Sequence, residues 1–246
     1  MRDIWARLKE VDQLRHILTI PCDSHSLNLL VKDLCLKVPE FSEAIKDGNS
    51  VTSHFKRASK QLAGLREIQV QRDGKTSPLA LAAETRWGSQ YNLVAALLNN
   101  RSNLLEFGSQ WDRELLRSET SRYVRSVLYN NDFWVTISQL ERLLKPINMA
   151  ITESQSERSH LGQVKERWLN LRQQLGAIQR SSEGLNWTLI WQLFEERQRT
   201  QLCEIHDLAF RLMPQNANLP WDRHEKAACV TELLNIQHET KAFTPV

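Results

Sequence analysis

Hydrophobic residues recur every three or four positions through most of the chain, which is the spacing of an amphipathic α-helix. The clearest series alternates steps of three and four, as helices packed in a bundle require; it consists of Leu161, Val164, Trp168, Leu171, Leu175 and Ile178. Similar patterns predict helices over residues 1–11, 26–34, 38–47, 50–71, 84–100, 131–154 and 187–213, with a polar break at 72–78. The sequence therefore predicts a mainly α-helical protein that forms a helical bundle.

Three of the predicted helices have distinctive hydrophobic faces. The helix over 84–100 carries a stripe of Trp87, Tyr91, Val94 and Leu98. In the helix over 131–154, Pro146 is expected to kink or end the helix because proline has no amide N–H. The stretch 187–213 is predicted as one long helix with a polar middle, buried at its two ends through Trp187, Trp191, Phe194, Ile205, Leu208 and Leu212.

One short segment departs from the helical pattern. Ile17, Leu18, Thr19 and Ile20 form a β-branched and aliphatic run that Pro21 ends, which predicts a buried strand over residues 16–22. A single strand cannot form a sheet, so its partner strands are expected to lie outside this chain.

Composition agrees with a soluble helical fold and leaves the function open. The 246 residues are 41% hydrophobic and 25% charged, and the 8 glycines and 7 prolines are few enough to favour long helices. The formal net charge of +3 permits a polyanionic partner but does not by itself indicate one. The basic cluster of His54, Lys56, Arg57 and Lys60 is accordingly either a solvated face or a DNA contact.

Cysteine usage and hydropathy indicate where the protein resides. The four cysteines lie far apart without framework spacing, and residues 1–11 have no apolar signal core, so an intracellular location in the nucleus or cytoplasm is expected. The longest apolar runs are much shorter than the roughly 20 residues that a bilayer crossing needs. No membrane partner is expected.

Cys22 and His25 form a Cys-x-x-His pair at the predicted end of the strand. From the residues alone, such a pair is more often a capping or core feature than a metal site. A zinc site would need a second pair, and Cys203 with His206 offers one, but it lies some 180 residues away in the sequence.

Three separate stretches, "IPCDSHSLNLLVKD", "ETRWGSQYNLVAALL" and "FWVTISQLERLLKPINMAITESQSERSHLGQVKERWLNL", occur in an order and spacing that resemble the hAT family of DNA transposases. The resemblance covers about residues 1–215. In that family a large all-helical domain is inserted into a ribonuclease H-like core, between its last strand and its last helix. The resemblance therefore implies a core remnant over 1–24 and a helical insertion domain over 25–246 that is incomplete at its C-terminal end.

The resemblance also implies roles for individual residues. His25 would face a DNA phosphate, and Cys22 would be a packed structural thiol beside it. Trp87 would stack on a base extruded from the duplex, with Arg86 supporting it or contacting a phosphate. A plain core position remains the alternative for Trp87. Lys56, Arg57 and Lys60 are the further candidates for DNA contact.

The three metal-binding carboxylates of the family have no counterparts at the matching places. Two would precede Met1, and the third belongs to a helix after the insertion. The family's Leu-Asp-Pro-Arg-like segment is Leu212-Met213-Pro214-Gln215 here. Asp23, Asp33 and Glu84 are expected to be solvated or capping carboxylates. Since two-metal chemistry needs converging carboxylates, no cofactor is expected, and Mg²⁺ or Mn²⁺ would serve only the complete family enzyme.

These observations lead to one expected function and two alternatives. The resemblance implies a truncated, transposase-derived protein without catalytic activity that retains contact with hairpin or flipped-base DNA. The first alternative is a helical scaffold that binds another protein through the surface a missing core leaves exposed. The lower-ranked alternative is an active transposase completed by segments from a second polypeptide.

Overall fold

The computed structural model describes residues 7, 10–11, 19–82, 88–182, 184–216, 218–220 and 222–241, with side chains as far as Leu234. The described part is mainly helical, as predicted, and contains no strand. Its longer elements are α2 (Asp23–Lys37), α3 (Pro39–Arg57), α4 (Ser59–Asp73), α5 (Ser89–Asn99), α6 (Arg101–Gln110), α8 (Glu119–Tyr129), α9 (Asn131–Ser154), α10 (Gly162–Arg180), α11 (Trp187–Gln201), α12 (Glu204–Arg211) and α13 (Arg223–Lys241). Two short elements are α7 (Asp112–Leu115) and the 3₁₀ helix η2 (Pro214–Asn216).

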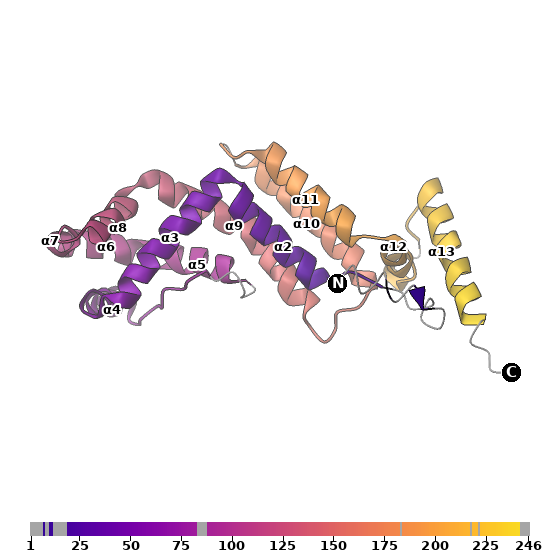
Figure 1. Ribbon diagram of the computed structural model, residues 1–246, viewed down its shortest axis with the longest axis horizontal. Coiled ribbons are helices and arrows are strands. Elements are labelled where there is room, and N and C mark those ends of the chain that lie inside the picture. Colours follow the sequence, from indigo (N-terminus) through magenta and orange to yellow (C-terminus); the bar gives the residue numbers. More distant parts are fainter. Residues whose placement is uncertain are drawn as a thin grey trace.

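The molecule is elongated, with α4 and α6 to α8 at one end and α13 at the other (Figure 1). The chain bends at Val38, whose extended backbone ends α2, and Pro39 then begins α3 at a position where proline is favoured. α2 lies beside α9, α10 and α11, whereas α3 leads into the lobe that contains α4 and α8 (Figure 1). This bend therefore separates the two parts of the molecule that carry the predicted site residues.

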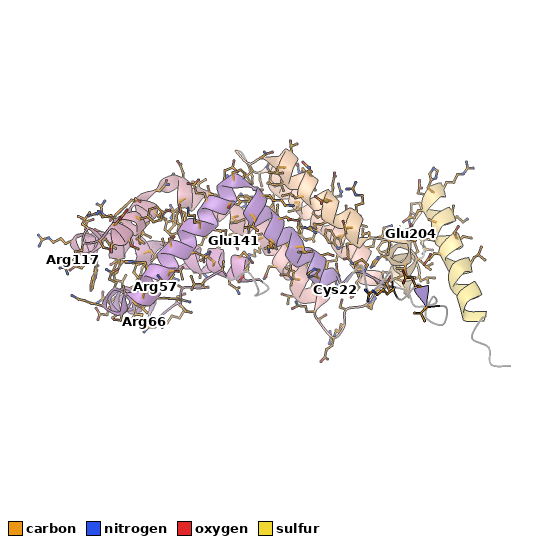
Figure 2. All side chains as sticks on the ribbon, viewed as in Figure 1. Cys22, Arg57, Arg66, Arg117, Glu141 and Glu204 are labelled. Carbon is orange, nitrogen blue, oxygen red and sulfur yellow. The ribbon has the colours of Figure 1, made fainter. Side chains whose placement is uncertain are left out.

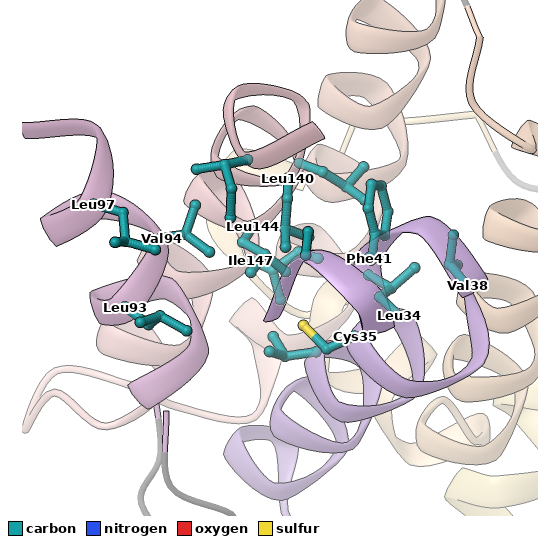
Figure 3. Packing of buried hydrophobic residues seen from close by; sticks show 14 of the residues in the cluster. Leu34, Cys35, Val38, Phe41, Leu93, Val94, Leu97, Leu140, Leu144 and Ile147 are labelled. Atoms are coloured by element: carbon teal, nitrogen blue, oxygen red, sulfur yellow. The ribbon is translucent and has the colours of Figure 1, made fainter. Parts of the chain in front are cut away.

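α9 is the central helix and packs against α2, α3, α5, α8 and α10. Figure 3 shows side chains of α2, α3, α5 and α9 meeting in one hydrophobic core, among them Leu34, Phe41, Val94 and Leu144. Pro146 lies inside α9, which continues to Ser154, so the helix does not end there. Burying large aliphatic and aromatic side chains contributes roughly 1.5 to 3 kcal/mol for each one, which makes this core the main source of stability.

The predicted face of α10 is confirmed. Val164, Trp168, Leu171 and Leu175 are buried, and Ile178 is partly buried against the same core. On the helix over 84–100, the described residues show a slightly different face, because Leu93, Val94 and Leu97 are buried while Tyr91 and Leu98 are only partly so.

The predicted long helix over 187–213 is wrong, because the chain breaks between α11 and α12 at Leu202 and Cys203. Cys203 has an extended backbone (φ −139°, ψ 173°), and its N–H donates to Nδ1 of His206, three residues into α12. This bond satisfies the N-terminal group of a new helix and so fixes the break. Leu212, expected to be buried, is 69% exposed.

The predicted strand over 16–22 is not shown. Residues 19–22 are described and adopt no strand, and residues 16–18 lie outside the described part. Most of the predicted helix over 1–11 lies outside it as well. The predicted boundary after residue 24 falls in the first turn of α2 and stays a prediction.

A group of ion pairs attaches α13 to the rest of the molecule. Nζ of Lys165 on α10 lies 2.8 Å from Oδ1 of Asp207 on α12, and it also pairs with Glu225 on α13. Arg211 contributes a further pair to Glu225 at 2.5 Å. Burial alone would raise the pKa of Glu225, but hydrogen bonds from Lys165 and Arg211 lower it below its ordinary value. The carboxylate of Glu225 therefore holds two cations from two different helices.

Candidate nucleic-acid interface

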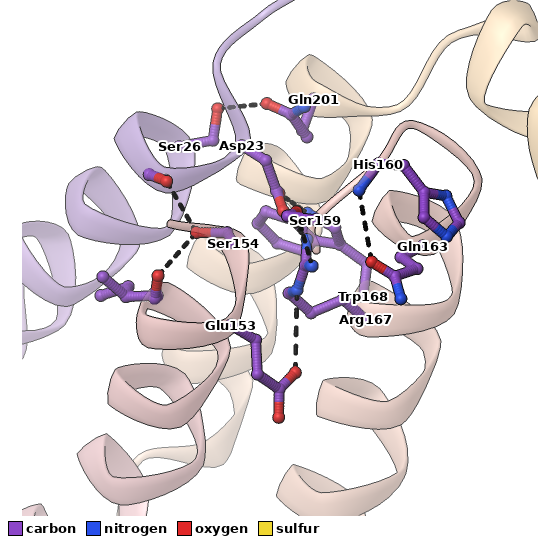
Figure 4. Close-up of polar contacts among 12 residues, drawn as sticks. Asp23, Ser26, Glu153, Ser154, Ser159, His160, Gln163, Arg167, Trp168 and Gln201 are labelled. Carbon is purple, nitrogen blue, oxygen red and sulfur yellow. Dashed lines mark hydrogen bonds and ion pairs between the residues drawn. The ribbon is translucent and has the colours of Figure 1, made fainter. Parts of the chain in front are cut away.

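The N-terminal end of α2 is fixed by side chains from three other helices, and we call this group the α2 junction. It comprises Asp23, Ser24, Ser26, Ser154, Arg167, Trp168 and Gln201. Oγ of Ser24 shares a hydrogen bond of 2.6 Å with Oγ of Ser154 at the end of α9. Oγ of Ser26 donates to Oε1 of Gln201, whose amide donates to the carbonyl of Pro21 at 3.1 Å. Figure 4 shows the bonds of Ser26 to Gln201 and of Ser154.

Asp23 makes the strongest contacts of the α2 junction. Nε1 of Trp168 donates to its Oδ1 at 2.8 Å, and Arg167 forms an ion pair with its Oδ2 (Figure 4). The side chains of Arg167 and Asp23 are only 5% and 10% exposed. The expectation that Asp23 is a solvated or capping carboxylate is therefore wrong, because its partners come from α10, more than 140 residues away.

Asp33 is also a buried ion-paired carboxylate rather than a solvated one. Nε of Arg197 on α11 donates to its Oδ2 at 2.6 Å, and Nζ of Lys37 lies 3.0 Å from its Oδ1. Both Asp23 and Asp33 thus serve to join α2 to neighbouring helices. Glu84 lies outside the described residues.

His25 and Cys22 are both exposed at the start of α2. Because the residues around His25 are bonded to other helices, the backbone that carries its imidazole is fixed while the ring remains accessible. Cys22 occupies the N-cap position without capping the helix through its side chain. The expectation that Cys22 is a packed thiol is wrong, since its side chain lies at the exposed entry to the helix (Figure 2).

Arg86 and Trp87 lie outside the described residues, but the chain is described again from Gly88. Gly88 adopts a positive φ of +69°, and a Cβ at this position would lie 3.0 Å from Oδ1 of Asn148 on α9. Asn148 precedes Ser154 by six residues, which is about 9 Å along a helix. The start of α5 and the α2 junction therefore contact α9 about 9 Å apart along its axis and on faces about 120° apart.

Lys56, Arg57 and Lys60 form what we call the basic corner, at the point where α3 ends and α4 begins. All three side chains are exposed, and none forms an ion pair with a described residue. Nζ of Lys60 lies 5.7 Å from the centre of the Trp111 ring. His54, from the same predicted cluster, is instead bonded through Nε2 to Oε1 of Gln61 at 2.5 Å.

The structure does not bring the basic corner and His25 together. Figure 2 labels Arg57 in the α3–α4 lobe and Cys22 at the far end of α2. The predicted site residues that the structure describes therefore fall into two separate regions of one elongated surface.

A hollow of about 1100 Å³ lies along α3 next to the basic corner, with α8 on its other side. We call it the α3–α8 groove; Lys46, His54, Arg57, Glu119 and Tyr123 are among its lining residues. Sequence reasoning missed Lys46 and the α8 residues. The sequence shows that Lys46 and Arg57 are spaced to share one face of a helix. It does not show that α8 packs beside that face.

The two Cys-x-x-His pairs come to the same region, because Gln201 contacts Pro21 and Ser26 and lies two residues before Cys203. Sγ of Cys203 is 3.1 Å from Nδ1 of His206. Burial raises the pKa of the Cys203 thiol and lowers that of the buried His206, which favours the neutral form of each. Within the described residues, no group of three or more His, Cys, Asp or Glu side chains could hold a metal ion.

No protein-family model matches this chain, and neither does any curated protein. Across the described residues, no helix combines the length and the apolar character that crossing a bilayer demands.

Proposed function

We propose that this chain is the helical insertion region of a hAT transposase-like protein and that it binds DNA without cutting it. The observation that carries the proposal is the basic corner, where three exposed cations have no anionic partner among the described residues. Unpaired cations on a rigid helical corner are suited to phosphate contacts, which dominate affinity for DNA. The proposal implies a nuclear location.

The packing of the three motif-bearing stretches supports the family assignment. The first stretch forms the start of α2, the second includes α5, and the third includes α9 and much of α10. α9 packs directly against each of α2, α5 and α10. Three stretches that resemble one family are thus neighbours in a single core rather than scattered over the surface.

Within this proposal, His25 contacts a phosphate and Trp87 stacks on an unpaired base. The exposed imidazole on the fixed α2 junction supports the first role. Both sites contact α9, through Asn148 and Ser154, and the proposal places one DNA substrate across the two residues.

The proposal assigns no DNA cleavage to this chain and no metal cofactor. Asp23 and Asp33 are held by Arg167 and Arg197, so ligating a metal would require breaking buried ion pairs. Removing one partner from such a pair is expensive because it leaves an uncompensated charge.

The test is a titration of labelled hairpin and duplex DNA at 50 and 200 mM salt. Three phosphate contacts give a slope of about −2.7 in log K against log salt, so affinity should fall about 40-fold between these concentrations. The Lys56→Gln/Lys60→Gln double variant should reduce the slope by about 1.8. A matched control is Arg223→Gln/Lys226→Gln, which removes two exposed cations of α13, at the other end of the molecule from the basic corner.

A helical protein-interaction scaffold is the second candidate, and one observation favours it. Val230, Leu233 and Leu234 are exposed at helical spacing on α13. Apolar side chains grouped in this way are suited to a protein partner. The scaffold function is favoured over DNA binding if the wild-type protein shows no salt-dependent affinity for either DNA. It is also favoured if the basic-corner double variant binds DNA with the same salt slope as its control.

A further inference from the structure

One face of α3 carries a line of cationic and hydroxyl side chains. Lys46, Ser50, Ser53 and Arg57 are separated by four, three and four residues, which places them within about 60° of one another around the helix axis. The opposite face buries Phe41, Ala44, Gly48, Val51 and Phe55. The polar line therefore faces away from the core, and all four of its members line the α3–α8 groove.

The charged residues that line the groove are two cations, Lys46 and Arg57, and one carboxylate, Glu119. Lys46 and Arg57 are exposed and form no ion pair with a described residue. Glu119 on α8 is the acidic residue among those that line the groove. The carboxylates of Asp47 and Glu43 lie near Tyr123 on the same side of the groove, and Oδ1 of Asp47 accepts a hydrogen bond of 2.5 Å from the Tyr123 hydroxyl. That bond raises the pKa of Tyr123 to about 12, so the hydroxyl stays protonated near neutral pH.

The groove is continuous with the basic corner. Arg57 and Ala58 line both this groove and a neighbouring hollow that also contains Lys60 and Arg117. Figure 2 labels Arg57, Arg66 and Arg117 in the same lobe. A polyanion bound in the groove would therefore extend directly to the cations at the end of α3.

We propose that the α3–α8 groove binds the phosphodiester backbone of DNA, with Lys46 and Arg57 contacting phosphates at its two ends. This inference rests on the proposed function and specifies where one strand lies. Arg57 follows Lys46 by eleven positions, which span about 16 Å along the helix, the axial rise of roughly five nucleotides. Ser53 lies between the two cations and supplies a hydroxyl, which is a common donor to phosphate oxygens, whereas the hydroxyl of Ser50 donates to the carbonyl of Lys46 at 2.9 Å.

The spacing favours a nucleic-acid backbone over an acidic peptide. Cations and hydroxyls along one straight helix suit an acceptor that repeats at regular intervals, as phosphates do. An acidic peptide would need its carboxylates spaced to match the same line of side chains. A polyglutamate peptide of matched charge is therefore the competitor in the test.

The test measures binding of a labelled 20-base-pair duplex to full-length Lys46→Gln, Arg57→Gln and Glu119→Gln proteins over a range of salt concentrations. Each of the two cation variants should weaken binding about fivefold to tenfold at 0.1 M salt and reduce the salt slope by about 0.9. Glu119→Gln should strengthen binding, because it removes the carboxylate that repels phosphate from the α8 side. Lys226→Gln on α13 is the matched control and should change neither quantity.

The outcomes separate this inference from the proposed function. Absence of salt-dependent DNA binding by the wild-type protein overturns both. Normal wild-type binding with Lys46→Gln and Glu119→Gln indistinguishable from Lys226→Gln overturns the groove assignment alone. Equal displacement of DNA by polyglutamate also overturns it, since the groove would then accept anions generally.

Discussion

At the scale of single residues, the α2 junction shows how carboxylates near a recognisable motif can have structural roles. Asp23 and Asp33 stand close to the Cys-x-x-His pair in sequence, yet their partners Arg167 and Arg197 follow more than 130 residues later. Local sequence reveals the charge of such a residue but not the distant side chain that neutralises it. For the same reason, exposure of Cys22 and His25 could be established only from the structure.

The Asp23→Ala substitution should destabilise the protein by about 3 kcal/mol, because the buried guanidinium of Arg167 then keeps only its 3.8 Å contact with the exposed carboxylate of Glu153. It also removes the acceptor for Nε1 of Trp168. Urea unfolding followed by circular dichroism measures the change. Glu67→Ala, an exposed carboxylate on α4, is the control and should stay within about 0.5 kcal/mol of wild type. A similar result for both variants would mean that the Asp23 pair is energetically neutral.

At the scale of helices, the spacing of hydrophobic residues predicted which segments are helical and which faces are buried. It predicted less well where each helix begins and ends. The α10 stripe is confirmed because alternating spacing over five turns leaves little choice of face. The break at Cys203 was missed because the Cys-x-x-His spacing resembles a metal motif, whereas here His206 accepts from the backbone and starts a helix. A helix start and a metal pair can thus use the same two residue types at the same spacing.

Gly64 permits the close approach of α4 to Trp111. A Cβ at Gly64 would lie 2.5 Å from Cζ2 and 2.7 Å from Cε2 of the indole, which is stacked on Phe107. Gly64→Ala should therefore lower the free energy of unfolding by about 1 to 3 kcal/mol. At Gly176 on α10, the nearest atom to an added Cβ is 3.8 Å away, so Gly176→Ala should stabilise the protein by up to about 1 kcal/mol. Equal shifts in thermal unfolding for the two variants would contradict this account.

The attachment of α13 should depend on pH through Glu225. Hydrogen bonds from Lys165 and Arg211 overcome the effect of burial and lower the pKa of this carboxyl. The stabilisation is therefore complete above the ordinary pKa of glutamate and is lost as pH falls through the lower, folded-state value. Hydrogen exchange of α13 should accelerate below about pH 4.5, relative to the core helices. In Glu225→Gln, α13 should exchange faster at neutral pH and show less change on acidification.

At the scale of the whole molecule, the two candidate DNA-contact regions lie at different places along an elongated surface (Figure 1). The sequence indicated the residues of each region but not the distance between them, since that distance depends on the bend at Val38 and on the packing of α9. It also did not reveal the α3–α8 groove, which forms only when α8 lies alongside α3.

The purified chain should not nick or join DNA in the presence of Mg²⁺ or Mn²⁺. Within the described residues, Asp23 and Asp33 are held in ion pairs, and no cluster could hold a metal ion. Conversion of supercoiled plasmid to the nicked form is the measurement, with a known metal-dependent nuclease as positive control. Metal-dependent nicking that persists through purification and disappears in Asp23→Ala or Glu84→Ala would reverse the prediction.

The position of α2 between α9 and α11 also has a consequence for synthesis of the chain. α2 carries the buried Leu27, Leu30 and Val31 and packs against α9 and α11 as well as the adjacent α3, and Ser26 bonds to Gln201 near the end of α11. At a translation rate of about 5 to 20 residues per second, roughly 10 to 35 s pass between emergence of α2 and emergence of α11. During that interval the apolar face of α2 lacks its final cover. The nascent chain should therefore be a chaperone client until residue 201 has left the ribosome, and α2 should dock late in folding.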